Sequence, residues 1–186
     1  MVTGVEYQAR ELLDPRIPKS EREHAAALTA MNPFRIYKRN LPVPSINHFL
    51  NEEEVETALY IAKENPGMIC PVESGFKRGS KKFLESVLFE GKAPKTKRLS
   101  AVCLCGACDP HTDWVYIKTR RGRSVQAMHS YNLVLSGNYQ IYAGGDYAPE
   151  RIAQGDCFIL RLTTLHWAEP VNDDPENVLW LVGFDV

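Results

Sequence analysis

Two histidines and one aspartate have the residue types and the spacing of a metal site. His111 and Asp113 are separated by one residue, and His166 follows 53 residues after Asp113. On an extended segment, side chains two residues apart point to the same face, so His111 and Asp113 could bind one ion together. A third ligand from a distant strand completes a set of two imidazoles and one carboxylate. This set leaves one face of an octahedral metal open, as in non-haem Fe(II) sites.

The same residues also have purely structural explanations. A histidine close to an aspartate is a common surface pair, and His166 beside Trp167 could be a packed core residue. The context favours a metal site, because His166 follows Gly155-Asp156 and the strand-like run CFILRL. It would therefore emerge where a jelly-roll strand turns back toward its pocket.

A rival donor set lies in the segment CLCGACDPH, with the ligand types that zinc prefers in Cys103, Cys105, Cys108 and His111. However, four ligands within nine residues form a cramped chelate and lack the distant second pair of a structural zinc site. Cys103 and Cys105 also share one face of a predicted strand, as core residues do. We therefore predict buried thiols here rather than zinc, and we place Cys70 in a loop before Pro71.

The second half of the chain supplies the elements that must position these residues. From about Lys97 it contains short β-rich runs, separated by turn-forming segments such as RRGR, SGN and VNDDPE. The runs are RLSAVCLC, DWVYIKT, SVQAMHSYNLVL, YQIYA, DCFILRL and NVLWLVGF. Several short strands at this spacing favour a β-sandwich or jelly roll over a parallel sheet.

Helices are predicted before the strands, over about residues 20–31, 51–65 and 80–89. The first two begin with a capping box, in which Ser or Asn is followed three residues later by Glu, and both end at a proline. We predict a mainly β (α+β) fold, a double-stranded β-helix or jelly roll with N-terminal helices packed outside. Residues 1–44 would form an N-terminal arm and helix, and residues 45–186 the jelly-roll domain with a helical lead-in.

The order of the segments resembles a known family. HTDW, YNLVLSGNYQIY, QGDCFILRLTTLHWAEPV and NVLWLVGF follow one another as in the double-stranded β-helix of the Fe(II)/2-oxoglutarate-dependent oxygenases, which belong to the wider cupin fold. INHFLNEEEVETAL is similar to the helical lead-in of prolyl-hydroxylase-like members. The resemblance covers about residues 45–186. It implies that His111, Asp113 and His166 are metal ligands and catalytic residues, with Fe(II) and 2-oxoglutarate as cofactors of a hydroxylase or demethylase.

One residue that the family usually has is missing. Its members usually place an Arg or Lys after the distal histidine to pair with the far carboxylate of 2-oxoglutarate, but residues 167–186 contain neither. Because an unpaired carboxylate in a dry pocket is costly, another cation must serve. Arg161 and Lys118 are the candidates, although both could be solvated surface charges. Tyr131, with His129 on the same strand, would line the pocket and is a third candidate for cofactor binding, and a packed aromatic face explains these two equally well.

Charge is distributed unevenly along the chain. The formal net charge is −1, yet residues 77–123 carry 12 Lys or Arg and 4 Asp or Glu. Such a segment could contact phosphates while Trp114 or Tyr116 stacks on a base, although a solvated positive face explains it too. Two hypotheses follow: an oxygenase acting on an unknown, anionic substrate, and a non-catalytic cupin-like module that binds a protein or nucleic acid through this segment.

Composition excludes several other classes. Hydrophobic residues make up 44% and charged residues 24%, as in ordinary globular proteins. No apolar run approaches the roughly 20 residues that span a bilayer, so no membrane contact is expected. An odd number of cysteines, five, favours a reducing compartment, and we predict a cytoplasmic protein. The sequence has no G-x-S-x-G elbow and no Gly-rich phosphate loop before a helix, which disfavours a nucleophilic hydrolase.

Overall fold

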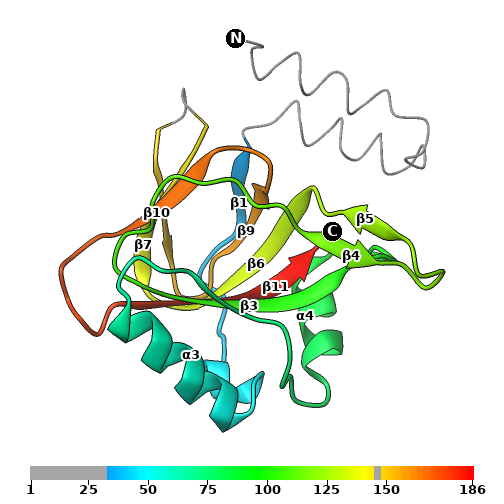
Figure 1. The fold of residues 1–186 in the computed structure, drawn as a ribbon, viewed down its shortest axis with the longest axis horizontal. Helices are drawn as coiled ribbons and strands as arrows, with labels where there is room; N and C mark the ends of the chain where they lie inside the picture. The colour runs from blue at the N-terminus through cyan, green and yellow to red at the C-terminus, as the bar shows by residue number, and fades with distance from the viewer. Residues whose placement is uncertain (1–32, 145–147) are drawn as a thin grey trace.

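The computed structural model describes residues 33–144 and 148–186 (Figure 1). The helix predicted over residues 20–31 lies outside this part of the chain. The described helical elements are η1 (Ile46–His48), α3 (Glu52–Glu64) and α4 (Ser80–Leu88). The described strands are β1 (Phe34–Lys38), β2 (Cys70–Val72), β3 (Arg98–Cys105), β4 (Tyr116–Lys118), β5 (Ser124–Gln126), β6 (His129–Ser136), β7 (Asn138–Ala143), β8 (Glu150–Ala153), β9 (Cys157–Arg161), β10 (His166–Pro170) and β11 (Val178–Asp185).

Two antiparallel sheets form the body of the domain. The larger has the strand order β1-β9-β6-β11-β3-β2 and the smaller the order β10-β7-β8, while β4 and β5 form a separate hairpin. Strands that are distant in sequence are neighbours, since β11 lies between β3 and β6. This non-sequential antiparallel pairing is a jelly roll, and it confirms the predicted mainly β fold class with helices outside.

The larger sheet is covered on both faces, which gives the domain two apolar cores. One face packs against α3 and α4 in a helix-side core that includes Phe49, Leu84 and Leu133. The other face packs against the smaller sheet in an inter-sheet core that includes Tyr139 and Phe158. Side chains alternate along a strand, so successive residues of the central strands enter different cores. The cavity described below lies on the inter-sheet face.

Most predicted elements are present, and the differences are confined to short segments. The helices predicted over 51–65 and 80–89 are α3 and α4, although the Asn51 side chain makes no capping hydrogen bond at the start of α3. β1 lies within the predicted N-terminal arm and joins the larger sheet by pairing with β9. The loop assignment of Cys70 is wrong, because Cys70 is buried in β2 and pairs with Cys103 of β3.

No helix among the described residues combines the length and the apolar character that crossing a membrane requires.

Candidate metal centre

The main chain brings His111, Asp113 and His166 together. His166 is the first residue of β10, and His111 lies on the segment that follows β3. The two histidines form an isolated antiparallel bridge, with His111 N donating to His166 O at 3.0 Å and His166 N to His111 O at 2.9 Å. Asp113 N donates to Leu162 O at 2.8 Å, which fixes the carboxylate beside the same turn.

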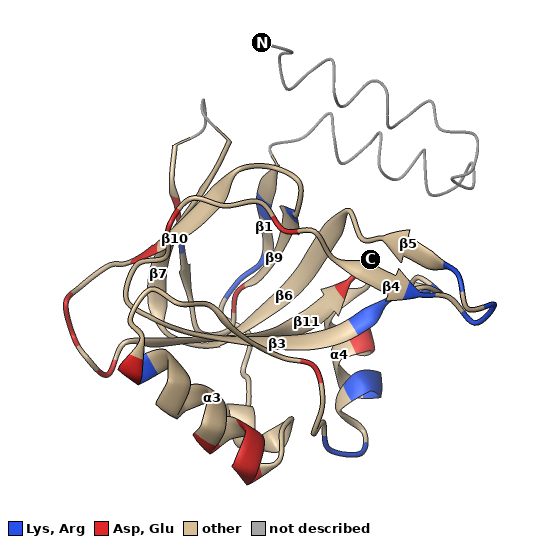
Figure 2. Ribbon diagram, viewed as in Figure 1, with Lys and Arg blue, Asp and Glu red and all other residues tan. Residues whose placement is uncertain are grey.

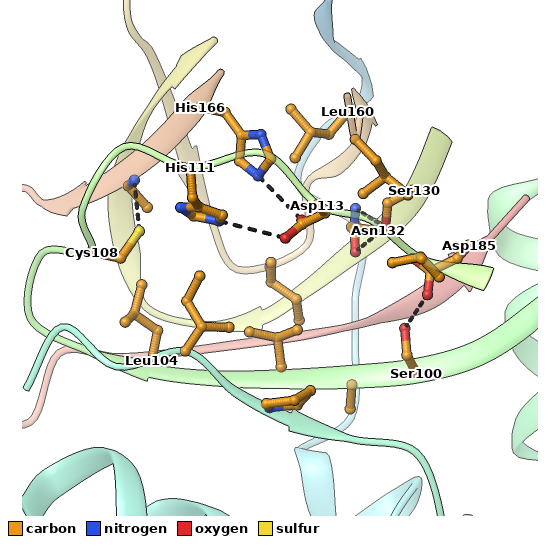
Figure 3. Close-up of a pocket in the computed structure, with 18 of the residues that line it drawn as sticks. Ser100, Leu104, Cys108, His111, Asp113, Ser130, Asn132, Leu160, His166 and Asp185 are labelled. Atoms are coloured by element: carbon orange, nitrogen blue, oxygen red, sulfur yellow. Dashed lines mark hydrogen bonds and ion pairs between the residues drawn. The ribbon is translucent and has the colours of Figure 1, made fainter. Parts of the chain in front are cut away.

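The three side chains converge on one point (Figure 3). His166 Nε2 lies 3.3 Å from Asp113 Oδ2, and His111 Nε2 lies 3.8 Å from Asp113 Oδ1. One donor atom from each residue lies within 4.8 Å of the others. In the part of the chain that the structure describes, this is the only group of three such donors close enough to hold an ion.

Hydrogen bonds to the backbone set the orientation of both imidazoles. His111 Nδ1 lies 2.7 Å from Asp109 O, and His166 Nδ1 lies 2.7 Å from Thr164 O. A carbonyl oxygen only accepts, so each Nδ1 donates a hydrogen bond, and each Nε2 is the ring nitrogen that faces Asp113 and is left to bind an ion. Metal-binding histidines are held in this way. The donors present therefore fit a divalent metal ion.

The electrostatics of Asp113 suit the same role. Burial raises the pKa of the Asp113 carboxyl, but its hydrogen bond to His166 and the nearby His166 and His111 imidazoles hold the pKa below its usual range. The carboxylate is therefore ionised at neutral pH, which a metal ligand requires. The His166 side chain is 7% exposed and that of Asp113 is 39%, so the ligand set is reached from the Asp113 side.

The triad lies in the wall of a cavity of about 430 Å³ between the two sheets. Most of the wall is apolar, and its members include Leu104, Ile141, Phe158, Leu160, Leu179 and Leu181. A polar group occupies the side away from the two histidines, where Figure 3 shows Ser100, Ser130, Asn132 and Asp185. Arg98 belongs to the same group through its contact with Asp185. A cavity with apolar walls and a few convergent polar groups is typical of a small-molecule site.

The predicted cofactor-binding residues lie elsewhere. Tyr131 faces the helix-side core, where its ring centroid is 4.9 Å from that of Phe89. Arg161 is buried at the end of β9 and is absent from the cavity wall, to which its neighbours Leu160 and Leu162 contribute. Lys118 is exposed on β4 and is also absent from the wall. The structure thus does not bring these three side chains to the triad.

Three charged residues of the cavity wall, Glu73, Arg98 and Asp185, were not identified from the sequence. Arg98 begins β3, and its Nη2 and Nε lie 2.9 and 3.1 Å from Oδ2 of Asp185 at the end of β11. Strand alternation could have indicated Arg98 and Asp185. An even number of residues separates Arg98 from Leu104 on β3 and Asp185 from Leu179 on β11, so each charged residue shares a strand face with a residue of the cavity wall. Their meeting depends on the pairing of β3 with β11, which the local sequence does not specify.

The cysteines are structural in the described part of the chain. Cys103 and Cys105 are buried in the helix-side core, while Cys108 lies in the inter-sheet core and its Sγ accepts a hydrogen bond from Ala168 N at 3.2 Å. Burial raises the pKa of the Cys103 thiol to about 12. These thiols therefore stay protonated at neutral pH. Because Cys103 and Cys105 lie on one side of the sheet and Cys108 on the other, they pack as core residues and do not converge on one zinc ion.

Comparison with known proteins adds little to this description. No protein-family model matches the chain, and no curated protein matches its sequence. Solved structures that match include oxalate decarboxylase from Bacillus subtilis (15% identity, 65% of this chain and 25% of that chain, TM-score 0.38). KdgF from Halomonas sp. (14%, 51% and 75%, TM-score 0.33) and an RmlC-like cupin protein from Desulfovibrio desulfuricans (14%, 50% and 76%, TM-score 0.34) also match.

The likeness to these structures is too low to support conclusions about activity. This chain spans about a quarter of the length of the oxalate decarboxylases that it matches. The assignment of a jelly roll rests on the strand order and pairing, and the assignment of a metal site rests on the three ligands.

Proposed function

We propose that the protein is a mononuclear non-haem Fe(II) oxygenase that hydroxylates or demethylates a small substrate, with 2-oxoglutarate as the expected co-substrate. The observation that carries the proposal is the convergence of two correctly oriented Nε2 atoms and one carboxylate in the wall of an apolar cavity. His111, Asp113 and His166 would hold the ion. Fe(II), when bound by such a triad, supplies open positions at which a co-substrate and O₂ react.

The protein's own residues would supply orientation and a dry environment. The carbonyls of Asp109 and Thr164 hold the imidazoles, so that the ligands need no rearrangement to bind the ion. The apolar wall, including Leu104 and Leu179, excludes water from the space beside Asp113. Exclusion of water protects reactive species from side reactions.

The 2-oxoglutarate co-substrate needs a cation to pair with its far carboxylate. Among the described residues of the cavity wall, Arg98 is the only Lys or Arg, so only its guanidinium is placed to pair with the far carboxylate of 2-oxoglutarate. Arg98 is already paired with Asp185 at 2.9 Å and with Glu73 at 2.7 Å. The far carboxylate of 2-oxoglutarate would therefore have to compete with the Asp185 and Glu73 carboxylates for the Arg98 guanidinium.

A second candidate function has one observation in its favour. Trp114 and Tyr116 are 61% and 58% exposed and lie at the cavity rim, beside the β4–β5 hairpin. The loop of this hairpin carries Arg120, Arg121 and Arg123 (Figure 2). Exposed aromatic rings next to cations favour single-stranded nucleic acid, so the alternative is a module that binds such a partner without catalysis.

Succinate formation separates the two functions. The protein is loaded with Fe(II) without oxygen, 2-oxoglutarate and air are added, and succinate and O₂ uptake are measured. We expect succinate release that is lost in His111→Ala and retained in Lys118→Ala, which changes only an exposed hairpin residue. Absence of turnover, together with oligonucleotide binding that weakens steeply with salt, would instead support the binding module.

A further inference from the structure

Together with Glu73 at the rim, the polar group of the cavity carries more negative than positive charge. Asp185 is only 5% exposed, and the guanidinium of Arg98 binds it through two nitrogens. The same guanidinium also binds Glu73 at the rim, at 2.7 Å from Nη1 to Oε1. Two carboxylates therefore share one cation, and the formal charge of this end of the cavity is −1.

The strand register explains why these groups meet. Asp185 of β11 is paired directly with Arg98 of β3 on one side and with Ser130 of β6 on the other. Residues directly opposite one another in adjacent strands share a face, so the three side chains form a row across the larger sheet. Ser100 and Asn132 lie two residues further along their strands, on the same face.

The hydrogen-bond directions leave acceptors on the cavity wall. Asn132 Nδ2 donates to Ser130 Oγ at 2.9 Å. Ser130 Oγ in turn donates to Asn132 Oδ1 at 3.2 Å. An amide oxygen has two lone pairs, so Asn132 Oδ1 can accept one further hydrogen bond from a ligand.

Asp185 itself has capacity left for a ligand. Arg98 and Ser100 both donate to Oδ2 of Asp185, the serine hydroxyl at 3.3 Å. Burial raises the pKa of Asp185 above its usual value, although Arg98 acts in the opposite direction. The negative charge is therefore incompletely balanced, and a further N–H donor with a positive charge would be stabilised here.

We propose that this end of the cavity binds the ammonium group of the substrate, through Asp185 and Asn132. The substrate class would then be an alkyl amine whose carbon chain lies along the apolar wall toward His111 and His166, an inference that rests on the proposed oxygenase function. Its charge is opposite to that of the anionic substrate expected from the basic segment. Arg98 in this arrangement is a positioning residue, because it holds Asp185 in place, and it does not pair with the far carboxylate of 2-oxoglutarate.

The test compares two probes of equal length and opposite charge, hexylamine and hexanoate, titrated into the full chain by calorimetry. We expect hexylamine to bind at least about tenfold more tightly than hexanoate, since one charge-assisted hydrogen-bonded contact is worth that much. Asp185→Asn should weaken hexylamine binding by about tenfold, and Asn132→Leu by a smaller factor. Glu73→Gln, at an exposed position, should weaken it about twofold to threefold even if Asp185→Asn does not fold.

Controls separate this inference from the proposed function. Glu53→Gln neutralises an exposed carboxylate on α3 away from the cavity and should leave both affinities unchanged. Mn(II) stoichiometry is measured on the same samples: Asp185→Asn should keep the metal and lose the amine, and His111→Ala should do the reverse. A wild-type protein that binds hexylamine but no Mn(II) would overturn the oxygenase proposal and leave the ammonium site standing. The ammonium site would be overturned if hexanoate bound as tightly as hexylamine or more tightly. It would also be overturned if Asp185→Asn, Asn132→Leu and Glu73→Gln all left the hexylamine affinity unchanged.

Discussion

His111 and His166 exchange two main-chain hydrogen bonds, of 3.0 and 2.9 Å, although they are 55 residues apart in the sequence. Their ring centroids lie 4.5 Å apart. The two imidazoles are therefore placed by the backbone itself, and a change of either side chain leaves the bridge between the segments intact. Variants of these ligands should fold, which makes the site testable by substitution.

Asp113→Asn should abolish tight metal binding without unfolding the protein. The amide keeps the size of the side chain and removes the charge, so the affinity should fall by more than the roughly 10–100-fold typical of outer-shell changes. Equilibrium dialysis against Mn(II) measures this. Asp109→Asn is the matched control, because the Asp109 side chain is exposed and only its carbonyl contacts His111. Equal losses in both variants would contradict the assigned ligand.

Arg98→Met should destabilise the protein by roughly 2–4 kcal/mol, because it leaves the buried Asp185 carboxylate without its guanidinium. Urea unfolding gives the value, and the double variant Arg98→Met/Asp185→Leu should regain part of the loss. Lys63→Met removes the exposed pair with Glu176, at 3.5 Å, and should change stability by less than about 1 kcal/mol. A similar small change for Arg98→Met would mean that the buried pair contributes little.

Gly183→Ala should be strongly destabilising, by about 3 kcal/mol or more, because a Cβ on β11 would collide with the carbonyl oxygen of Tyr131 on β6. Gly122→Ala is the comparison, since Gly122 has a φ of 76° but open space around it, and should cost only about 1–2 kcal/mol. Thermal unfolding of both variants checks the order. Equal losses of thermal stability in the two variants would show that the backbones of β6 and β11 move apart enough to admit the new Cβ.

Alkaline pH should destabilise the fold through its buried thiols. Burial raises the pKa of Cys103 from 9.0 to about 12 and that of Cys157 to about 11, so above pH 9 the unfolded chain loses protons that the folded chain retains. Stability is therefore lost as the pH rises, by about 1 kcal/mol for Cys103 between about pH 9 and pH 10. Cys103→Ala should show a smaller decrease in its free energy of unfolding over this range. An identical decrease would rule out this thiol as a cause.

The sequence predicted much of the fold because its local patterns were strong. The glutamate-rich start of α3 and the apolar face of α4 predict helices, and the β-rich runs contain β3, β4, β5, β6, β7, β9 and β11. The strands β1, β2, β8 and β10 were missed. They are three to five residues long, and β2 contains Pro71, so tertiary pairing rather than local preference makes them strands.

The ligand types and order of the triad were readable from the sequence, but the rest of the cavity was not. β6 is buried from His129 to Leu135, so its pattern does not show which face meets the cavity. Tyr131 was chosen for the wall, whereas Ser130 and Asn132 line it. The Arg98–Asp185 pair joins residues 87 apart and exists only because β3 pairs with β11.

Metal stoichiometry tests the central claim most directly. Mn(II), a spectroscopic substitute for Fe(II), is titrated into the wild-type chain and into His166→Ala, and the free ion is counted by electron paramagnetic resonance. The ligand geometry predicts one bound ion per wild-type chain and loss of that ion in His166→Ala, with both proteins folded. No bound ion in the wild type, or an undiminished one in His166→Ala, would contradict a metal centre formed by His111, Asp113 and His166.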